Sequence, residues 1–405
     1  MKRLIIHIDV NNAFLSWTAV NRLENGDTFD IRNVPSIIGG EEENRTGIVL
    51  AKSMPAKRLG IKTAEPIYFA KQKCRDLLVF PGDFKVYNRY SNALYELLKE
   101  YTDKIERFSI DECFMDMTGC LLNYGNVEEV VKEISERVYT ELKFTVNCGI
   151  AYNKLLAKMA SDFEKPNRIH TLYEHEIEAK LWKLPVGELF MVGKKSVDKL
   201  HAMRIQTIGD LAKTDKKLII KKFGKTGSMM HDYANGIDFS EVISKRPKPK
   251  GVGNEITFSQ DLSDYNKICE HLLPLAEQTM YRLRKEKMSA TVVAVKIKTK
   301  DFQILTKQRK LHAPTDSTKE VHEVAKELLK EVLKNYSIRL VGVRVDGLVD
   351  NNEIQLSLFD ADTRNKQHKL DNAVDKIKDK FGYKSISRAS EINVKREEDF
   401  NDSSN

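Results

Sequence analysis

The sequence predicts a multidomain α+β protein, and three observations carry this prediction. At 405 residues the chain is too long for one hydrophobic core. With residues 12–79 left out, the elements expected up to residue 163 follow the order strand, helix, two strands, helix, strand, which is typical of a ferredoxin-like antiparallel sheet backed by two helices. The same order returns over residues 251–349, so we expect a second, separate α+β domain there.

The first unit begins with residues 3–10, which are apolar and β-branched and therefore predict a buried strand. Asn11 and Asn12 are expected to cap a helix that runs to about residue 24. Hydrophobic periodicity and turn signals predict the remaining elements of this unit: helices over 84–102, 126–142 and 153–163, a hairpin over 105–118 and a strand over 144–151.

Other segments differ in composition. Residues 30–75 alternate short strand-like and helical runs, and residues 173–240 are helical and rich in lysine. The run Ser244-Lys-Arg-Pro-Lys-Pro-Lys250 has the basic, proline-containing composition of a linker. From Asp350 the chain turns polar, and we expect a mostly flexible tail with one candidate helix near 367–380.

Composition excludes several classes of protein. No stretch approaches the roughly 20 apolar residues that cross a bilayer. The N-terminal segment carries an acid too early for a signal peptide, so a cytoplasmic protein without a membrane partner is expected. The five cysteines are widely spaced and form no Cys-x-x-Cys pair, which favours reduced thiols over disulfides or zinc.

The positive charge is concentrated in one part of the chain. The formal net charge is +8, and residues 241–350 hold 21 Lys and Arg against 15 Asp and Glu. Such a local excess is typical of proteins that bind a phosphate backbone. Alternatively, these charged residues simply form solvent-exposed faces that bind no partner.

Three carboxylates are candidates for a metal site. Asp9 closes the buried first strand, and Asp111-Glu112 lies at the tip of the hairpin. In the predicted sheet these two segments are central neighbours, so the acids converge at one end. Hard oxygen ligands without histidine suit Mg²⁺, and two such ions can clamp an in-line phosphoryl displacement. Alternatively, Asp9 caps the following helix and Asp111-Glu112 is a solvated turn.

Four segments, in this order, carry a resemblance to a known family: His7-Ile-Asp-Val-Asn-Asn-Ala-Phe14, Ser109-Ile-Asp-Glu112, Asn153 to Lys158 leading into Lys165-Pro-Asn167, and Gln355-Leu-Ser-Leu-Phe359. The chain resembles the Y-family translesion DNA polymerases, the ImpB/MucB/SamB group, from residue 3 to about residue 360. The resemblance implies a right-hand polymerase with a ferredoxin-like palm, small fingers, a helical thumb and a separate α+β little finger. The implied domains are palm 1–11 and 80–172, fingers 12–79, thumb 173–240, linker 241–250, little finger 251–349 and flexible tail 350–405.

The resemblance also implies an active site. Its catalytic metal ligands are Asp9, Asp111 and Glu112 with the Val10 carbonyl, holding two Mg²⁺ ions. Phe14 falls on the steric gate, the residue under the sugar that excludes a 2′-hydroxyl. Lys57 and Lys165 fall on nucleotide-binding positions, although the family commonly has Tyr and Arg where this chain has Met54 and Lys57. An ordinary core aromatic is the alternative for Phe14, and a helix-terminal lysine is the alternative for Lys165.

Two further surfaces are implied. The strand Val293–Lys300 alternates apolar residues with lysine. The little-finger DNA surface is therefore expected to contain Lys296, Lys298, Lys300, Arg309 and Lys310. The peptide with Gln355, Leu356, Leu358 and Phe359 matches the motif with which bacterial polymerases dock on the sliding clamp. The alternative for the lysine surface is a merely solvated face. The alternative for the peptide is a terminal strand that returns to the chain's own domain.

The expected function is template-directed DNA synthesis with low fidelity past lesions, as in DNA repair and SOS mutagenesis. Its partners would be primer–template DNA, dNTPs and the clamp, and the protein would be a monomer. The alternatives are a catalytically silent relative that docks on clamp and DNA, and a non-enzymatic DNA-binding adaptor. Gly39-Gly-Glu-Glu-Glu43 is similar to a diguanylate cyclase signature, but it lacks the aromatic ending and lies outside the hairpin.

Overall fold

The computed structural model describes residues 3–40, 47–120, 126–245, 247–351 and 361–387. The chain divides into two compact units, Met1–Gly39 with Ile48–Arg246, and Gly40–Gly47 with Pro247–Asn405. Each unit has its own hydrophobic core. Within the described ranges no helix is long and apolar enough to cross a membrane.

The centre of the first unit is a five-stranded sheet. Its strands are β1 (Ile5–Val10), β5 (Ile105–Arg107), β6 (Glu112–Asp116), β7 (Val146–Ala151) and β8 (Ile169–Thr171). Their order is β5-β6-β1-β7-β8, and β1 runs antiparallel to both β6 and β7. All six residues of β1 are buried, His7 and Asp9 included, as expected for a mostly apolar strand at the centre of a sheet. The predicted ferredoxin-like order is confirmed, with β8 added at one edge.

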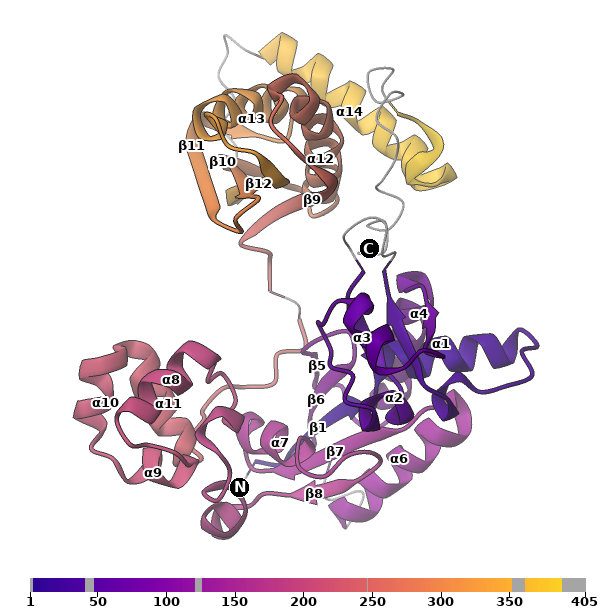
Figure 1. The fold of residues 1–405 in the computed structure, drawn as a ribbon, viewed down its shortest axis with the longest axis vertical. Coiled ribbons are helices and arrows are strands. Elements are labelled where there is room, and N and C mark those ends of the chain that lie inside the picture. The colour runs from indigo at the N-terminus through magenta and orange to yellow at the C-terminus, as the bar shows by residue number, and fades with distance from the viewer. Residues whose placement is uncertain (1–2, 41–46, 121–125, 246, 352–360, 388–405) are drawn as a thin grey trace. The chain divides into compact units, whose positions relative to one another are not determined.

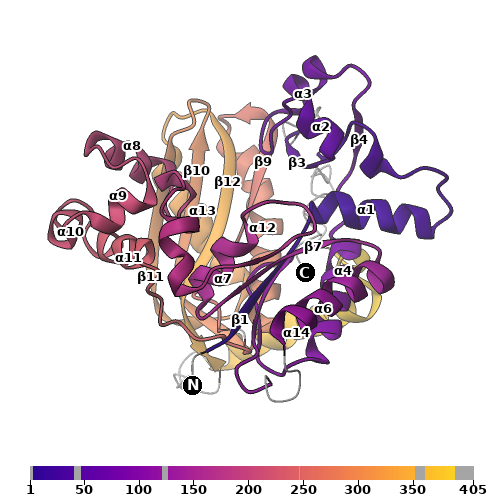
Figure 2. The same ribbon diagram turned by 90° about the horizontal axis from the view of Figure 1, so that it is seen from below.

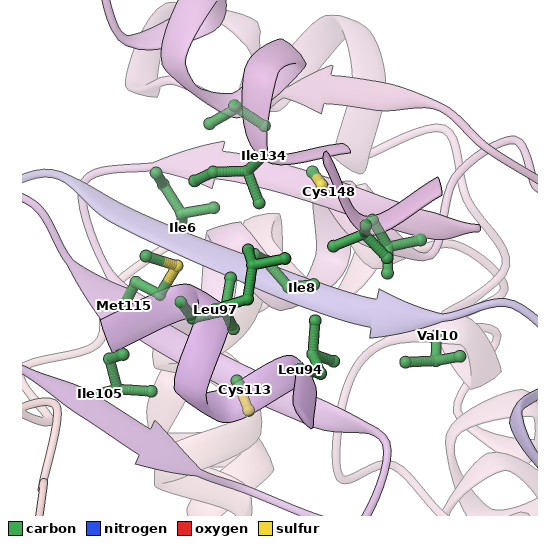
Figure 3. Close-up of a cluster of buried hydrophobic side chains, with 14 of the residues drawn as sticks. Ile6, Ile8, Val10, Leu94, Leu97, Ile105, Cys113, Met115, Ile134 and Cys148 are labelled. Carbon is green, nitrogen blue, oxygen red and sulfur yellow. The ribbon is translucent and has the colours of Figure 1, made fainter. Parts of the chain in front are cut away.

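One face of this sheet is covered by α4 (Phe84–Lys99) and α6 (Val127–Leu142). Asp83 and Asn126 start these helices, since their side chains accept hydrogen bonds from the first backbone N–H groups. The core between helices and sheet includes Ile6, Ile8, Leu94, Leu97 and Ile134, drawn in Figure 3.

A second cluster of buried side chains contains α7 (Lys154–Ser161) and the helical segment that follows it. A Cβ on Gly149 of β7 would lie 2.0 Å from the carbonyl oxygen of Ala157, so glycine is what lets α7 pack this closely on the strand. The helices of the segment are α8 (Lys194–Ala202), α9 (Ile208–Lys213), α10 (Lys216–Phe223) and α11 (Lys225–Ala234), after the short η2 (Glu174–Glu176), η3 (Ile177–Leu181) and η4 (Val186–Glu188).

The segment inserted after β1 begins with α1 (Ala13–Glu24) and carries a small sheet of its own (Figure 2). Asn12 precedes α1 but makes no capping hydrogen bond, because its backbone is left-handed with φ of 48°. The expectation that it caps the helix is therefore wrong. The sheet order is β3-β2-β4, with β2 (Ser36–Gly39), β3 (Val49–Lys52) and β4 (Leu78–Phe80), beside η1 (Ile31–Asn33), α2 (Met54–Arg58) and α3 (Ile67–Lys73).

The second unit has a four-stranded antiparallel sheet with α12 (Tyr265–Lys285) and α13 (Thr318–Leu333) packed on it (Figure 1). Its strands are β9 (Gly251–Leu262), β10 (Met288–Thr299), β11 (Ile304–Thr315) and β12 (Ile338–Asp350). The sheet order is β11-β10-β12-β9. The predicted sequence of elements is confirmed, but here the first strand lies at an edge, whereas in the first unit it is central.

The C-terminal segment contains a helix where the sequence analysis expects a candidate helix, near residues 367–380. Helix α14 (Ala361–Phe381) is followed by η6 (Tyr383–Ser385). Arg284 of α12, only 7% exposed, forms a two-pronged ion pair with Asp375 of α14, with Nε–Oδ2 and Nη2–Oδ1 distances of 2.6 and 3.0 Å. Lys378 pairs with the buried Glu277 at 3.1 Å. The helix predicted near 367–380 is confirmed, and its ion pairs with α12 hold this polar helix in place, which the composition alone did not indicate.

Replacing Arg284 by Met is expected to loosen α14 and lower the free energy of unfolding by about 3 kcal/mol, because the largely shielded carboxylate of Asp375 would lose its partner. Urea denaturation and limited proteolysis of α14 measure the two effects. Lys285→Met is the matched control: its pair with Asp379 is half exposed, so about 1 kcal/mol or less is expected. Equal losses in the two variants would contradict the role given to the buried pair.

Candidate active site

Asp9 of β1 and Glu112 of β6 lie opposite each other on adjacent central strands. They are directly paired in the β1–β6 register, and the backbone N–H of Val10 donates to the carbonyl oxygen of Asp111 at 3.0 Å. The structure therefore brings the end of β1 to the turn before β6, as the sequence predicts. Asp9 is buried, and Glu112 is largely shielded with its side chain 17% exposed.

Two lysines neutralise this carboxylate pair. Lys158 of α7 lies 2.7 Å from Glu112 Oε1 and 3.4 Å from Asp9 Oδ2. Lys165 lies 3.1 Å from Asp9 Oδ1 and 2.9 Å from Asp162 Oδ1. Burial, aided by the neighbouring Asp9 and opposed by Lys158, raises the pKa of Glu112 to about 7. Burial lowers the pKa of Lys158, but its bond to Glu112 and the charges of Asp162 and Asp9 outweigh this and raise it.

Asp111 lies next to the pair in the chain, but its carboxylate is turned to its own loop. Asp111 Oδ1 accepts a hydrogen bond from the Ser109 hydroxyl at 2.6 Å. In the part of the chain described here, no three acidic, histidine or cysteine side chains are grouped closely enough to hold a metal ion. The chemistry of the donor set nevertheless fits Mg²⁺: oxygen ligands only, and close carboxylates whose mutual repulsion a cation relieves.

Two residues of the quoted motifs had no role in the sequence-based site. Lys158 bridges both carboxylates. His7 is fully buried, with Nδ1 2.7 Å from the Ser161 hydroxyl and Nε2 3.9 Å from Glu112 Oε2. Burial, then the charges of Lys158 and Lys165, holds the pKa of His7 well below its usual value, so its ring is neutral at pH 7. A lysine among the apolar residues of α7 was the available signal for Lys158.

Phe14 lies on α1 and is fixed by other aromatic rings. It stacks on Tyr87 with a centroid distance of 4.6 Å and meets the edge of Phe84 at 5.6 Å. The ring is only partly buried. This arrangement makes it a rigid side chain five residues after Asp9, as a steric gate requires, while its packing also gives it a structural role.

Met54 and Lys57 lie on the short helix α2. Lys57 is exposed; burial, and then the positive charge of Lys57, lowers the pKa of the neighbouring Lys52. Met54 lines a pocket of about 380 Å³ in which Arg58 takes part and Lys57 does not.

The predicted DNA surface of the second unit is divided between two faces. Val293, Val295 and Ile297 of β10 are buried against the helices, and the alternating Lys296 and Lys298 lie on the other face, as predicted. Lys310 is opposite Val292, and Lys300 is exposed just after β10.

Arg309 is the exception within this set. It is opposite the buried Val293 in the β10–β11 register, so it points to the helix-covered face. There it pairs with Glu327 and Glu331 of α13. The prediction that Arg309 shares a surface with the lysines is therefore wrong. Successive residues of a strand point to opposite faces of the sheet, so Arg309 and its neighbour Lys310 lie on different faces. The clamp-motif residues Gln355, Leu356, Leu358 and Phe359 lie outside the described residues.

Comparison with known proteins extends these observations. The impB/mucB/samB family matches residues 8–162, its C-terminal domain matches residues 249–358, and the DNA polymerase-iota thumb domain matches residues 188–238. A DNA polymerase IV of Clostridium acetobutylicum is 47% identical over 389 residues, covering 96% of this chain and 98% of that protein. A DNA polymerase IV of Acetivibrio thermocellus is 35% identical, covering 96% of this chain and 97% of that protein. A Y-family DNA polymerase chimera of known structure superposes with a TM-score of 0.76 at 25% identity, covering 86% of this chain and all of that one.

Fold and site together define a multidomain polymerase whose acidic residues lie at one end of a ferredoxin-like sheet. The chain belongs to the impB/mucB/samB family, the Y-family DNA polymerases, and within it to the DNA polymerase IV group.

Proposed function

We propose that this DNA-directed DNA polymerase transfers nucleotides from dNTPs to a primer 3′-hydroxyl with two Mg²⁺ ions held by Asp9, Asp111, Glu112 and the Val10 carbonyl. One observation carries the proposal: Asp9 and Glu112, 103 positions apart in the sequence, are directly paired on adjacent strands. Positive charge relieves the repulsion between two neighbouring carboxylates, and Lys158 supplies it in this structure.

When bound, the metal ions lower the pKa of the primer hydroxyl and stabilise the charge that develops on the departing pyrophosphate. The chain's own residues orient the reactants. Lys165, beside Asp9, and Lys57 on the inserted segment provide point charges for the triphosphate. Phe14, fixed by Tyr87, excludes a 2′-hydroxyl from the sugar position. The small inserted sheet favours an open site, which would suit synthesis past damaged templates.

Lys158 is a positioning residue in this proposal. Lys158→Met should lower the free energy of unfolding by about 3 kcal/mol in EDTA, because Glu112 would lose its counter-ion and Asp9 would keep only Lys165. Added Mg²⁺ should recover part of this loss by binding the folded site. Urea denaturation with and without Mg²⁺ measures both effects, with the exposed Lys132→Met as control. A loss that Mg²⁺ leaves unchanged would count against a metal at this pair.

The proposed macromolecular partners follow from the lysines of the second unit and from the peptide Gln355–Phe359. We assign primer–template DNA to the face of the second unit with Lys296, Lys298, Lys300 and Lys310, without Arg309. The bacterial sliding clamp is assigned to the peptide from Gln355 to Phe359, whose apolar side chains suit a partner's pocket. The protein acts as a monomer in the cytoplasm, where primer–template and dNTPs are found.

Deleting residues 355–359 is expected to abolish binding to the sliding clamp, because the apolar anchors are lost. Surface plasmon resonance with immobilised clamp measures this, and primer extension without clamp should persist at the parent rate. A deletion of equal length at residues 397–401 serves as control. Retained clamp affinity in the 355–359 deletion would refute the assignment.

Primer extension with the purified full chain tests the function as a whole. Product should require template, dNTPs and Mg²⁺ together. DNA binding that is sensitive to salt but gives no Mg²⁺-dependent product would instead identify an adaptor without catalysis.

A further inference from the structure

Asn147 is a fully buried polar residue beside the carboxylate pair, and the proposed mechanism gives it no role. It lies on β7, directly opposite Asp9 in the β1–β7 register. Its side-chain Nδ2 donates hydrogen bonds to the carbonyl oxygens of Ser161 and Glu164 at 3.0 and 2.9 Å. Its Oδ1 accepts one from the backbone N–H of Arg168 at 3.1 Å. Each polar atom of this buried amide therefore has a partner, which compensates its removal from water.

These three hydrogen bonds close the loop of residues 162–168. They reach both of its ends, because Ser161 is the last residue of α7 and Arg168 directly precedes β8. The loop is largely exposed and forms neither helix nor strand. All three partners are backbone groups, so the carboxamide of Asn147 holds the path of the chain rather than any one side chain of the loop.

The loop carries Asp162 and Lys165, which belong to the cluster of charges around Asp9. Asp162 lies 3.1 Å from Lys158 Nζ and 2.9 Å from Lys165 Nζ. Lys165 in turn lies 3.1 Å from Asp9 Oδ1. A lysine side chain is long and flexible, so its charge stays at one place only when the backbone that carries it is fixed. Asn147 supplies this fixation from β7, the strand next to Asp9.

A second link fixes the end of α7 from β1. The hydroxyl of Ser161 donates to the carbonyl oxygen of Lys158 at 2.8 Å and lies 2.7 Å from Nδ1 of His7. A hydroxyl has a single proton, and here it goes to Lys158, so Nδ1 of His7 is the donor to Ser161. His7 and Asn147, both fully buried, thus hold the side chain and the carbonyl group of the same serine. The start of the loop is therefore fixed from two central strands.

We propose that Asn147 is a positioning residue of the polymerase: through the loop of residues 162–168 it holds Lys165 where the triphosphate of the incoming nucleotide binds. The inference rests on the proposed function, which gives Lys165 its role toward the triphosphate. Because its side chain is fully buried, Asn147 acts through Lys165 and not by direct contact with the nucleotide. A contact made equally in the bound state and in the transition state affects KM more than kcat, so loss of this positioning raises the KM for dNTP.

Asn147→Ala removes all three hydrogen bonds, and the milder Asn147→Ser leaves a shorter side chain that cannot replace them all. Ile150→Val is the matched control, since Ile150 is also fully buried on β7 but belongs to the core between sheet and helices. Lys165→Ala and the double variant Asn147→Ala/Lys165→Ala complete the set. Primer extension gives KM and kcat for dNTP, and hydrogen exchange reports on the amides of residues 162–168 in the DNA-free protein. Thermal unfolding confirms that the variants fold.

Lys165→Ala should raise the KM for dNTP by about tenfold, as expected for one charge-assisted contact, and change kcat by less than about threefold. Asn147→Ala should approach the same KM, with Asn147→Ser between it and the parent. The double variant should match Lys165→Ala, because a lysine that is absent cannot be misplaced. Both Asn147 variants should exchange the loop amides faster than the parent, and Ile150→Val should match the parent in KM and exchange.

An unchanged KM in Asn147→Ala beside a raised KM in Lys165→Ala overturns the proposal. So does a double variant whose KM rises by the product of the two single effects, since Asn147 would then act independently of Lys165. If Lys165→Ala leaves the KM unchanged, the role of Lys165 in the proposed function fails, and positioning for the nucleotide fails with it. Hydrogen exchange still decides the hold on the loop in that case: faster exchange in Asn147→Ala supports it, and exchange like that of the parent overturns it.

Discussion

Replacing Asp111 by Asn should lower the rate of Mg²⁺-dependent primer extension by about 10³-fold or more, since several kcal/mol of transition-state stabilisation depend on the metal ions. The amide keeps an oxygen donor but removes the negative charge that attracts a cation. Asp111 is the best carboxylate to change, because its side chain bonds only to the nearby Ser109 and supports no buried ion pair in the described structure. Stability should therefore stay close to that of the parent.

Asp103→Asn provides the control for this experiment. Asp103 is an exposed aspartate just before β5, and β5 begins opposite Met115, at the end of β6 that is farther from Glu112. Asp103→Asn should extend primers at the parent rate. Equal extension by Asp111→Asn and the parent, at saturating dNTP and with DNA binding intact, would remove the two-metal assignment.

Replacing Phe14 by Ala should raise the use of ribonucleotides relative to deoxyribonucleotides by about 10²-fold or more, because the clash that rejects a 2′-hydroxyl is removed. The free energy of unfolding should fall by about 3 kcal/mol, because the ring stacks on Tyr87 and contacts Phe84. The ratio of kcat/KM for the two sugars and a urea titration measure the two effects separately.

Phe84→Ala separates selectivity from packing. Phe84 belongs to the same aromatic cluster as Phe14 but lies at the start of α4 rather than near Asp9. It should lose stability while its sugar selectivity stays that of the parent. If Phe84→Ala changed selectivity as strongly as Phe14→Ala, the effect would belong to the cluster and no single ring would be the gate.

Much of the fold could be predicted because its signals are local. The buried strand β1, the amphipathic helices α4 and α6, and the hairpin all follow from hydrophobic period and turn residues. The pairing of Asp9 with Glu112 also followed, since a ferredoxin-like order leaves few places for two apolar strands.

The sequence by itself determined the order of elements and the meeting of Asp9 with Glu112, because these depend on the pattern along single strands and helices. Only the tertiary structure decided that Lys158 neutralises both carboxylates, that Arg309 lies on the helix-covered face, and that α14 is fixed by Arg284. Each of these depends on an ion pair between segments that are distant in the chain, and no local sequence pattern predicts such a pair. The physical reason is that burying an unpaired charge is costly. A buried charge therefore requires a partner that is close in space, and the spacing of residues along the sequence does not show which residue that will be.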